Sequence, residues 1–234
     1  TWSLQHTNPL DNGFFNGMAF WDQSHGVVVG DPVDGTLFLL ATTDGGATWE
    51  RLTGPQVPRV LEGEYGFAAS GTNITTFGDH GLAIVSGGPV ARVFRTQDRG
   101  ASWTVSSTPM ASGNASSGIF SISFRSSEEA LVVGGDYQAP EVTSGTVAFS
   151  SDGGASWTLA TEPHSVGFRS GVAWREDPDH PMWIAVGTSG SSFSLDGGYA
   201  WENFDSGAYN AVAFSGATGF AAGPDGRIAR LVVR

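Results

Sequence analysis

A seven-residue stretch recurs four times in this chain, as Thr43-Asp44-Gly45-Gly46-Ala47-Thr48-Trp49, Gln97-Asp98-Arg99-Gly100-Ala101-Ser102-Trp103, Ser151-Asp152-Gly153-Gly154-Ala155-Ser156-Trp157 and Leu195-Asp196-Gly197-Gly198-Tyr199-Ala200-Trp201. The aspartate of each copy can accept hydrogen bonds from backbone N–H groups of its own turn, and glycine adopts backbone angles that other residues resist. The tryptophan then packs the turn onto neighbouring strands. We therefore expect structural roles for eight residues of these "box turns": Asp44, Trp49, Asp98, Trp103, Asp152, Trp157, Asp196 and Trp201.

The sequence before each copy repeats as well. Apolar runs that end in glycine, such as Val27–Gly30 and Leu131–Gly134, follow shorter apolar runs such as Met18–Phe20. Apolar, β-branched stretches bounded by turn residues predict strands. Each unit thus has four strands, a to d, with the box turn between c and d. A unit of about 35 to 54 residues has the size of one β-propeller blade.

The two ends of the chain suggest how the blades are arranged. The last unit contains strands a, b and c but no box turn and no strand d, whereas Thr1–Leu4 resembles the end of a box turn followed by a strand d. We therefore expect Ser3–Gln5 to pair near Leu231 and close the ring, which removes the free sheet edge. The prediction is one all-β domain, residues 1–234: a five-bladed β-propeller of four-stranded antiparallel blades. The alternative is five blades remaining from a seven-bladed propeller.

Composition excludes several functions. The net charge is −12, and all 11 basic residues are arginine, which argues against nucleic acid because phosphate binding needs a basic face. The absence of cysteine rules out thiol nucleophiles and cysteine-bound metals. No apolar run reaches the roughly 18 residues of a membrane-spanning helix. The segment Thr1–Ser3 lacks the basic and apolar regions of a signal peptide, so we expect any such peptide to have been removed.

The four box turns follow the Asp-box pattern, S/T-x-D-x-G-x-T/S-W, and they carry a family resemblance together with Gly17–Asp22, Gly30–Gly35, Ala91–Arg95 and Gly226–Arg230. The whole chain resembles the Asp-box (BNR-repeat) propellers of the photosystem II stability/assembly-factor-like group and its bacterial "oxidoreductase-like" relatives. The resemblance implies an exported protein, periplasmic or extracellular. No dinucleotide-binding, P-loop or nucleophile-elbow motif accompanies it, so the residues give no support to an oxidoreductase.

Candidate binding residues lie in the loops between strands d and a and between strands b and c, which share one face of a propeller. This loop face forms an acidic rim with aromatic residues. The predicted binding residues are Asp31, Asp34, Arg59, Glu62, Glu64, Tyr65, Asp136, Tyr137, Arg169 and Tyr209. Other rim residues include His6, Asp11, Glu141, His164 and Asp225.

Two kinds of chemistry were weighed for these loops. Glu62, Glu64 and Tyr65, with Arg59 and Arg169, could form a sialidase-like group; that chemistry needs three converging arginines, and Arg125 is a poor third. A solvated loop with local ion pairs explains the same residues. Asp31-Pro32-Val33-Asp34-Gly35 could hold a structural calcium ion through oxygen ligands, but a tight turn needs these residue types too. The five histidines show no metal-ligand spacing, and we expect no other cofactor.

The sequence thus leaves two functions open. The first is a non-enzymatic binding or assembly scaffold, a monomer that uses the loop face and central channel to hold a protein or peptide partner. The second is a carbohydrate-active Asp-box protein, either a sialidase-like glycoside hydrolase or a glycan-binding lectin. The sequence has no recognisable catalytic constellation, which favours the scaffold. We therefore assign no catalytic residues, leave enzyme activity open while favouring a non-enzyme, and expect no hydrolase activity on sialosides or common β-glycosides.

Overall fold

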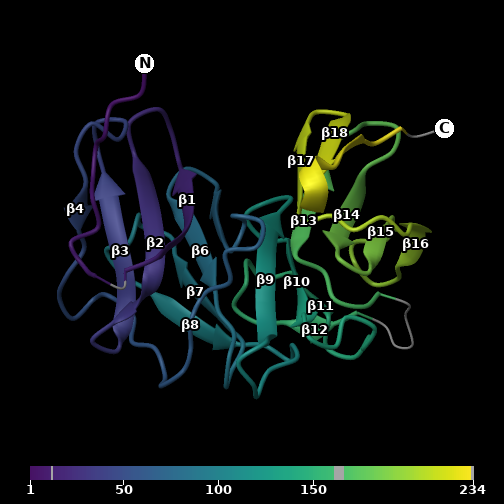
Figure 1. Ribbon diagram of the computed structural model, residues 1–234, viewed down its shortest axis with the longest axis horizontal. Coiled ribbons are helices and arrows are strands. Elements are labelled where there is room, and N and C mark those ends of the chain that lie inside the picture. Colours follow the sequence, from purple (N-terminus) through teal and green to yellow (C-terminus); the bar gives the residue numbers. More distant parts are fainter. Residues whose placement is uncertain (12, 161–165, 233–234) are drawn as a thin grey trace.

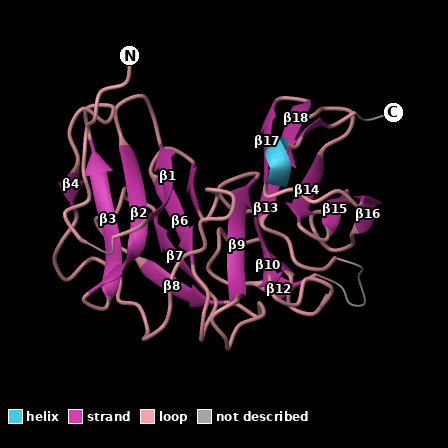
Figure 2. Cartoon of the chain, in the orientation of Figure 1, coloured by secondary structure: helices cyan, strands magenta, loops and turns pink. Residues whose placement is uncertain are grey.

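The computed structural model of the chain describes residues 1–11, 13–160 and 166–232, and His164 of the predicted rim lies outside them. Within the described residues the chain is almost entirely β-structure (Figures 1 and 2). The strands are β1 (Phe15–Phe20), β2 (Gly26–Val33), β3 (Thr36–Thr42), β4 (Glu50–Arg51), β5 (Ile74–Phe77), β6 (Gly81–Val85), β7 (Arg92–Thr96), β8 (Thr104–Ser107), β9 (Ser117–Phe124), β10 (Ala130–Asp136), β11 (Val147–Ser150), β12 (Thr158–Leu159), β13 (Gly171–Arg175), β14 (Met182–Gly187), β15 (Gly190–Ser194), β16 (Glu202–Asp205), β17 (Ala211–Ser215), β18 (Thr218–Ala222) and β19 (Ile228–Arg230).

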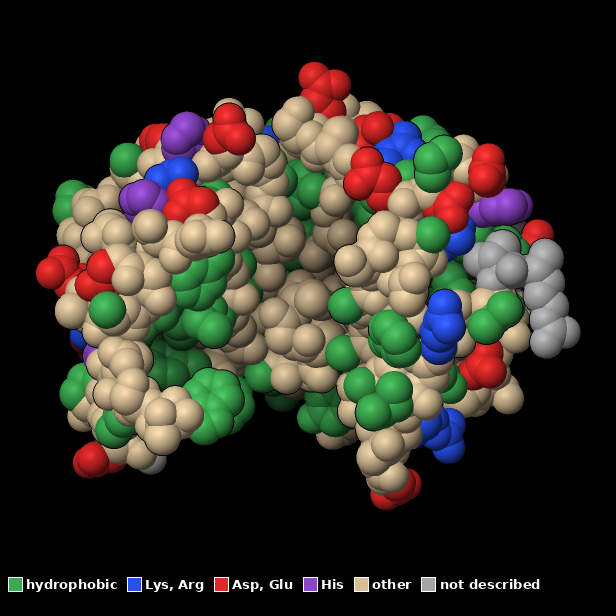
Figure 3. Space-filling view, turned by 90° about the horizontal axis from the view of Figure 1, so that it is seen from above, with side chains coloured by type: hydrophobic (Ala, Val, Ile, Leu, Met, Phe, Trp, Pro, Cys, Tyr) green, Lys and Arg blue, Asp and Glu red, His purple; other side chains and the backbone are tan. Residues whose placement is uncertain are grey.

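The strands form five antiparallel sheets in sequence order, as expected for five blades. Sheets one to four have four strands each, and the fifth has three, β17-β18-β19. The first strands of successive sheets, β1, β5, β9, β13 and β17, lie next to one another and form the inner side of the arrangement. Each blade thus follows its neighbour around a common centre, which Figure 3 shows from above as a hollow.

Within the described residues the two ends of the chain do not pair to close a ring, which corrects the prediction for Ser3–Gln5 and Leu231. Thr1–Leu4 forms no strand, and Trp2 and Leu4 are exposed rather than paired near Leu231. Figure 1 shows the N-terminus beside the first blade and the C-terminus at the opposite end of the arc. The physical reason is that five blades packed at this spacing turn through only part of a circle, so the end strands do not meet. Figure 3 accordingly shows a notch in the outline, with hydrophobic side chains on both sides.

The core lies between the blades. Strands b are the most buried elements: every residue of β6 and β14 is buried, as the apolar runs in the sequence predict. The blade 5 strands β17 and β18 are largely exposed by comparison, with Phe220 52% accessible. A blade needs a neighbour on both sides to bury its two faces, and within the described residues blade 5 packs against blade 4 alone.

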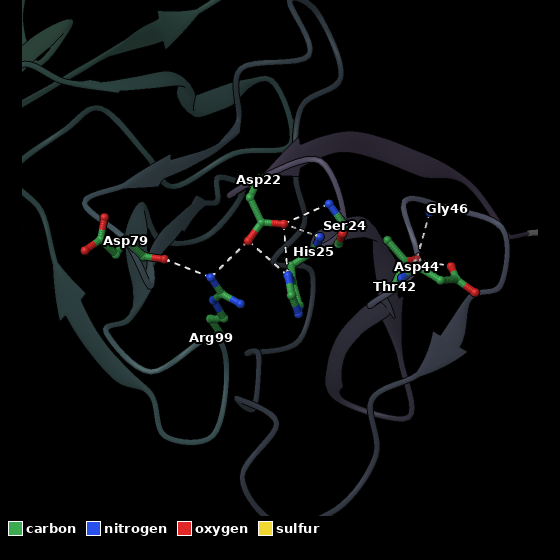
Figure 4. Close-up of polar contacts among 8 residues, drawn as sticks. All are labelled: Asp22, Ser24, His25, Thr42, Asp44, Gly46, Asp79 and Arg99. Carbon is green, nitrogen blue, oxygen red and sulfur yellow. Dashed lines mark hydrogen bonds and ion pairs between the residues drawn. The ribbon is translucent and has the colours of Figure 1, made fainter.

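The box turns adopt one geometry. In the first, Thr42 Oγ1 donates a hydrogen bond to Asp44 Oδ1 over 2.8 Å, and Thr48 N donates to the same oxygen over 2.9 Å. The Thr48 hydroxyl donates to Asp44 Oδ2 over 2.7 Å. Gly46 N donates to Thr42 Oγ1 over 2.9 Å, and Figure 4 shows Thr42, Asp44 and Gly46 of this turn. Equivalent bonds hold Asp98, Asp152 and Asp196, although Ala200 supplies only its backbone N–H in the last turn.

The box tryptophans join successive blades. Trp157 and Trp201 are buried, while Trp49 and Trp103 are half-buried, so the expected burial is complete for two of the four. Trp157 packs with Val85 and Val93 of the preceding blade, and its indole N–H donates to Gly154 O over 3.2 Å. Trp49 belongs to the first of the described blades, and no preceding blade among the described residues covers it, which accounts for its exposure here.

Two faces of the arc can be distinguished by their turns. The box turns share one face with the a–b turns: Gly45 N donates to Ser24 O over 2.8 Å, and Gly153 N donates to Glu128 O over 2.6 Å. We call this the box face, and the opposite side, with the d–a and b–c loops, is the loop face.

The described residues contain a single three-residue helical turn, Pro224–Gly226, and among them no helix is long and apolar enough to cross a membrane.

Candidate functional site

The loops of the loop face are held close to the inner strands by glycine. Each apolar run of strand b ends in glycine because the backbone of the segment before strand a passes directly over it. A side chain at Gly134 would overlap the carbonyl oxygen of Gly118, and one at Gly187 would overlap that of Phe168. The close approach places the residues that flank strands β9 and β13 around the centre of the arc.

Five aromatic rings from four segments meet there, and we call them the aromatic cluster: Tyr65, Phe67, Phe120, Tyr137 and Phe168. Phe67 and Phe120 stack at 3.9 Å between ring centroids, and Phe168 meets Phe120 edge-on at 4.7 Å. Tyr137 stands edge-on to Phe67 and Phe120 at 6.4 and 6.2 Å. The three phenylalanines are buried, whereas Tyr137 is 48% accessible. The cluster therefore presents a tyrosine to solvent from a rigid aromatic base.

Carboxylates lie beside this tyrosine. Asp136 precedes it in the chain and accepts hydrogen bonds from Asn114 Nδ2 at 3.1 Å and from Gln138 N at 2.9 Å. Hydrogen bonding to Ser116 is the main influence that holds the pKa of Asp136 below its ordinary value. Asp31 accepts a hydrogen bond from Asn16 Nδ2 at 3.1 Å and is half-buried. Two predicted acidic residues thus accompany the aromatic cluster.

The hydroxyl and the ring of Tyr65 both contact other residues of the protein. Its hydroxyl donates to the backbone oxygen of Ala115, and its ring meets Phe67 at 5.1 Å. Burial is the main cause that raises its pKa, with further contributions from Tyr137 and Asp31. A phenol with a raised pKa is a poor nucleophile, because nucleophilic attack needs the deprotonated form.

Glu64 is buried, and its contacts hold neighbouring loops together. The prediction that it lies on the exposed rim is therefore wrong. Its carboxylate pairs with the Arg92 guanidinium, whose Nε donates to Glu64 Oε1 over 2.9 Å. It also accepts bonds from the Ser86 hydroxyl at 2.6 Å and from Leu61 N at 2.8 Å. A carboxylate held by an arginine, a hydroxyl and a backbone N–H is not available to activate the neighbouring Tyr65.

Arg169 also lies in the interior, with 1% of its surface accessible. Its guanidinium donates to Ser189 Oγ at 2.6 Å and to Ser192 Oγ at 2.7 Å, and burial lowers its pKa to about 10. Arg125 sits on the box face, where Glu129 binds it. Arg59 is exposed on the loop face. The three arginines considered for a sialidase-like site therefore lie in different places.

The remaining predicted residues are dispersed. Glu62 is exposed, and Asp34 occupies an exposed turn with φ +52°, followed by Gly35 at φ +71°. The backbone of this turn accounts for the Asp-Gly pair by itself. Tyr209 lies half-buried between blades 4 and 5, with Arg227 over its ring at 5.8 Å. Among the described residues no three of His, Asp and Glu are grouped as metal ligands.

Sequence reasoning missed the three phenylalanines of the aromatic cluster. A signal was present, since an aromatic residue occurs shortly before or within strand a of each blade: Phe15, Phe67, Phe120, Phe168 and Tyr209. From sequence periodicity alone, such residues are predicted to belong to the hydrophobic core. Only the packing of blades 2, 3 and 4 around one centre shows that three of them meet.

Comparison with solved structures identifies the architecture. A structure described as "YCF48 bound to D1 peptide" matches with a TM-score of 0.58 and 21% identity, over 93% of this chain and 63% of that one. The chain has a β-propeller fold. YCF48 from Cyanidioschyzon merolae matches with a TM-score of 0.55 and 19% identity, over 91% of this chain and 65% of its own. This propeller therefore spans less than two thirds of either of those two chains.

Other propellers match at lower identity. A GH74 xyloglucanase from Xanthomonas campestris has a TM-score of 0.50 and 15% identity, over 89% of this chain and 43% of that one. No family model matches the chain, and no curated protein matches its sequence. At these identities the comparisons establish the fold alone.

Proposed function

We propose that this propeller is a non-enzymatic scaffold that binds a protein or peptide partner through its loop face and central channel. The observation that carries the proposal is the aromatic cluster, whose exposed Tyr137 stands on buried rings and directly follows Asp136, while Asp31 acts electrostatically on Tyr65 of the same cluster. Tyrosines held rigidly on an apolar base are frequent anchors of protein interfaces, because little side-chain entropy is lost on binding.

The charge of the chain indicates what the partner presents. With a net charge of −12 and carboxylates beside the anchor, a basic or neutral segment is favoured over an acidic one. Interactions of this kind weaken as salt rises, since the exposed charges are screened. An apolar side chain in the partner segment would pack against Tyr137, and a basic one would face the carboxylates.

Two further points support a scaffold. YCF48, with which this chain shares its fold, has a structure described as bound to a D1 peptide, and the box turns resemble those of the assembly-factor group. That support is by analogy of fold. The second point is chemical: Glu64 is held by Arg92, Tyr65 has a raised pKa, and the candidate arginines are dispersed. These contacts disfavour sialidase-like catalysis.

A glycan-binding role is the second candidate, because exposed tyrosines beside carboxylates can also pack against sugar rings and GH74 xyloglucanases share the fold. The two candidates share a location, so one set of variants tests both. Tyr137→Ser removes the anchor, while Tyr199→Ser removes a comparably exposed tyrosine of the box turn in blade 4.

The experiment is selection of a random peptide phage library on the immobilised chain, with a glycan array in parallel. We expect enriched peptides that combine basic and apolar residues, bind at least about tenfold more weakly to Tyr137→Ser, and bind Tyr199→Ser normally. Their binding should also weaken as salt rises. Peptide binding that is equally strong to Tyr137→Ser and to the unchanged protein would contradict the proposed site. Glycan binding that is lost in Tyr137→Ser would establish the second candidate.

A further inference from the structure

The box turn of blade 4 departs from the repeat at three exposed positions. Leu195 replaces a polar residue of the other three turns, Tyr199 replaces an alanine, and Ala200 replaces a threonine or serine. Blades 3 and 4 each have a neighbour on both sides within the described residues. The exposure of these residues therefore belongs to this turn and does not come from the end of the arc.

One departure leaves a carboxylate oxygen free. In the first three box turns a hydroxyl donates to Oδ2 of the box aspartate, as Ser156 does to Asp152. Ala200 has no hydroxyl, and Asp196 accepts its two hydrogen bonds at Oδ1, from Ser194 Oγ and from Ala200 N, both at 2.9 Å. No described residue donates to Asp196 Oδ2. Because Asp196 is exposed, this oxygen can accept a hydrogen bond from a ligand.

The strand of blade 3 that faces this turn also differs from its counterpart in blade 2. Arg95 of β7 and Phe149 of β11 occupy the same position, each opposite the threonine that follows a box tryptophan. A side chain at Gly154 would meet the Arg95 stem at 3.8 Å, and one at Gly198 would meet Phe149 at 3.7 Å. Both residues therefore lie against the corresponding glycine in the box turn of the next blade.

Arg95 shows what this position can hold. Its Nη1 donates to the backbone oxygens of Asp152 and Gly153, at 3.3 and 2.5 Å. An arginine of the chain itself thus binds the box turn between blades 2 and 3. Phe149 cannot donate such bonds, and its ring lies 4.2 Å from that of Tyr199. Among the described residues no guanidinium takes the equivalent place between blades 3 and 4.

A cavity of about 190 Å³ lies there, between the a–b turn of blade 3 and the box turn of blade 4. Its walls include the rings of Phe149 and Tyr199, the Asp196 side chain and the ion pair of Arg125 with Glu129. This space equals the liquid volume of about six water molecules, which is room for one planar side-chain group. Two carboxylates and one guanidinium give its walls a net negative charge. We call this cavity the box groove.

We propose that the box groove binds an arginine side chain of a partner protein. A guanidinium is planar and weakly hydrated, so it can stack on an aromatic ring while it donates a fork of hydrogen bonds to a carboxylate. It would take the place that Arg95 fills one interface earlier, with Asp196 Oδ2 as an added acceptor. The net charge of −12 favours a basic partner. This inference is independent of the proposed loop-face function, because the box groove lies on the opposite face.

The test is an NMR titration of the full chain with a blocked tripeptide, glycine-arginine-glycine, followed through the backbone amide signals of Gly197 and Gly198. We expect these signals to shift with a Kd on the order of 1 mM, ordinary for a single side chain. The same peptide with citrulline, an uncharged isostere of arginine, should bind at least about tenfold more weakly. The lysine peptide should also bind more weakly, because an ammonium group does not stack flat on a ring.

Three variants locate the binding. Phe149→Arg places an arginine of the chain itself in the box groove, as in blade 2, and should weaken peptide binding at least about tenfold. Ala200→Ser restores the hydroxyl that occupies Oδ2 in the other turns and should weaken binding about threefold. Both variants introduce residues that neighbouring blades carry at the same position, and thermal unfolding checks that they fold. Val105→Arg adds the same charge at an exposed site of β8 and should leave binding unchanged.

Several results would overturn the inference. One is unchanged binding of the arginine peptide to Phe149→Arg, and another is equal binding of the arginine, citrulline and lysine peptides. Galactose or glucose that shifts the Gly197 and Gly198 signals when the arginine peptide does not would make the box groove a sugar site instead. A side chain held at millimolar strength is not retained in a washed peptide selection, so Tyr199→Ser remains a valid control for the loop face.

Discussion

Arg99 stands where the other three box turns have glycine. It has φ +55°, a left-handed conformation that costs a non-glycine residue about 1 kcal/mol or more. Its side chain offsets this cost by reaching the preceding blade. Nη2 donates to Asp22 Oδ2 over 3.1 Å (Figure 4), and the guanidinium lies 5.6 Å from the centre of the Trp21 ring. Asp22 also binds His25 Nδ1 at 2.9 Å. One strained residue thus connects the box face of two blades.

Two substitutions at Arg99 separate the strain from the contacts. Arg99→Ala keeps the left-handed backbone and loses the contacts, so it should be the less stable variant. Arg99→Gly loses the same contacts but relieves the strain, and we expect it to be more stable than the alanine variant by about 1 kcal/mol. Urea unfolding of the two variants measures the difference. Equal stabilities would mean that the backbone at residue 99 carries no strain.

Among the elements, the box turn with its tryptophan joins one blade to the next. Trp157 contacts both its own blade and the preceding one, and its indole lies 3.3 Å from the Ser106 hydroxyl of strand β8. Trp49 has only its own blade, where Phe20 meets it edge-on at 6.0 Å. The same motif therefore contributes differently according to its place in the arc.

Alanine at these tryptophans should reveal the difference. Trp157→Ala and Trp201→Ala each remove a buried ring from an inter-blade core, and we expect losses of roughly 3–5 kcal/mol in unfolding free energy. Trp49→Ala should cost clearly less, because its ring is half exposed and borders no preceding blade. Denaturant unfolding of the three variants gives the comparison, and a Trp49→Ala loss as large as the others would contradict this assignment.

For the whole molecule, the box aspartates make stability depend on acid. Hydrogen bonds from Thr48 and Ser102 are the main causes that lower the pKa of Asp44 and Asp98 to about 2. The pKa of Asp152 is also lowered to about 2: burial opposes the shift, and the hydrogen bond from Ser156 is the largest favourable cause. A carboxyl whose pKa is lower in the folded state than in the unfolded state stabilises the fold above its unfolded pKa.

This stabilisation is therefore complete above about pH 4 and is lost as pH falls from about 4 through about 2. The urea midpoint should fall steeply as pH drops through that interval. Above about pH 4 these three aspartates should no longer make the midpoint depend on pH. Ser156→Ala removes the hydroxyl that binds Asp152, so its midpoint should depend less on acid. An unchanged acid slope in this variant would show that the hydrogen bond does not set the pKa.

What the sequence by itself determined is local. The box turns, the buried b strands and the glycines that end them follow from residue types at short spacing, because their hydrogen bonds and backbone angles involve neighbours in the chain. The role of Glu64 was not accessible in this way, since its partner Arg92 is 28 residues away. Nor was the aromatic cluster, whose rings come from segments about 100 residues apart, Tyr65 to Phe168.

Only the tertiary structure decided whether the ring closes. The sequence of Thr1–Leu4 resembles the end of a box turn, but strand pairing uses the backbone, so this resemblance does not specify which sheet edge the segment would join. Where that segment pairs depends on the angle through which five blades turn, and this angle is set by side-chain packing between successive sheets. Among the described residues β19 pairs with β18 alone, and Trp2 lies exposed at the other end of the arc. The physical reason is that pairing preference is local, whereas closure is a property of the whole assembly.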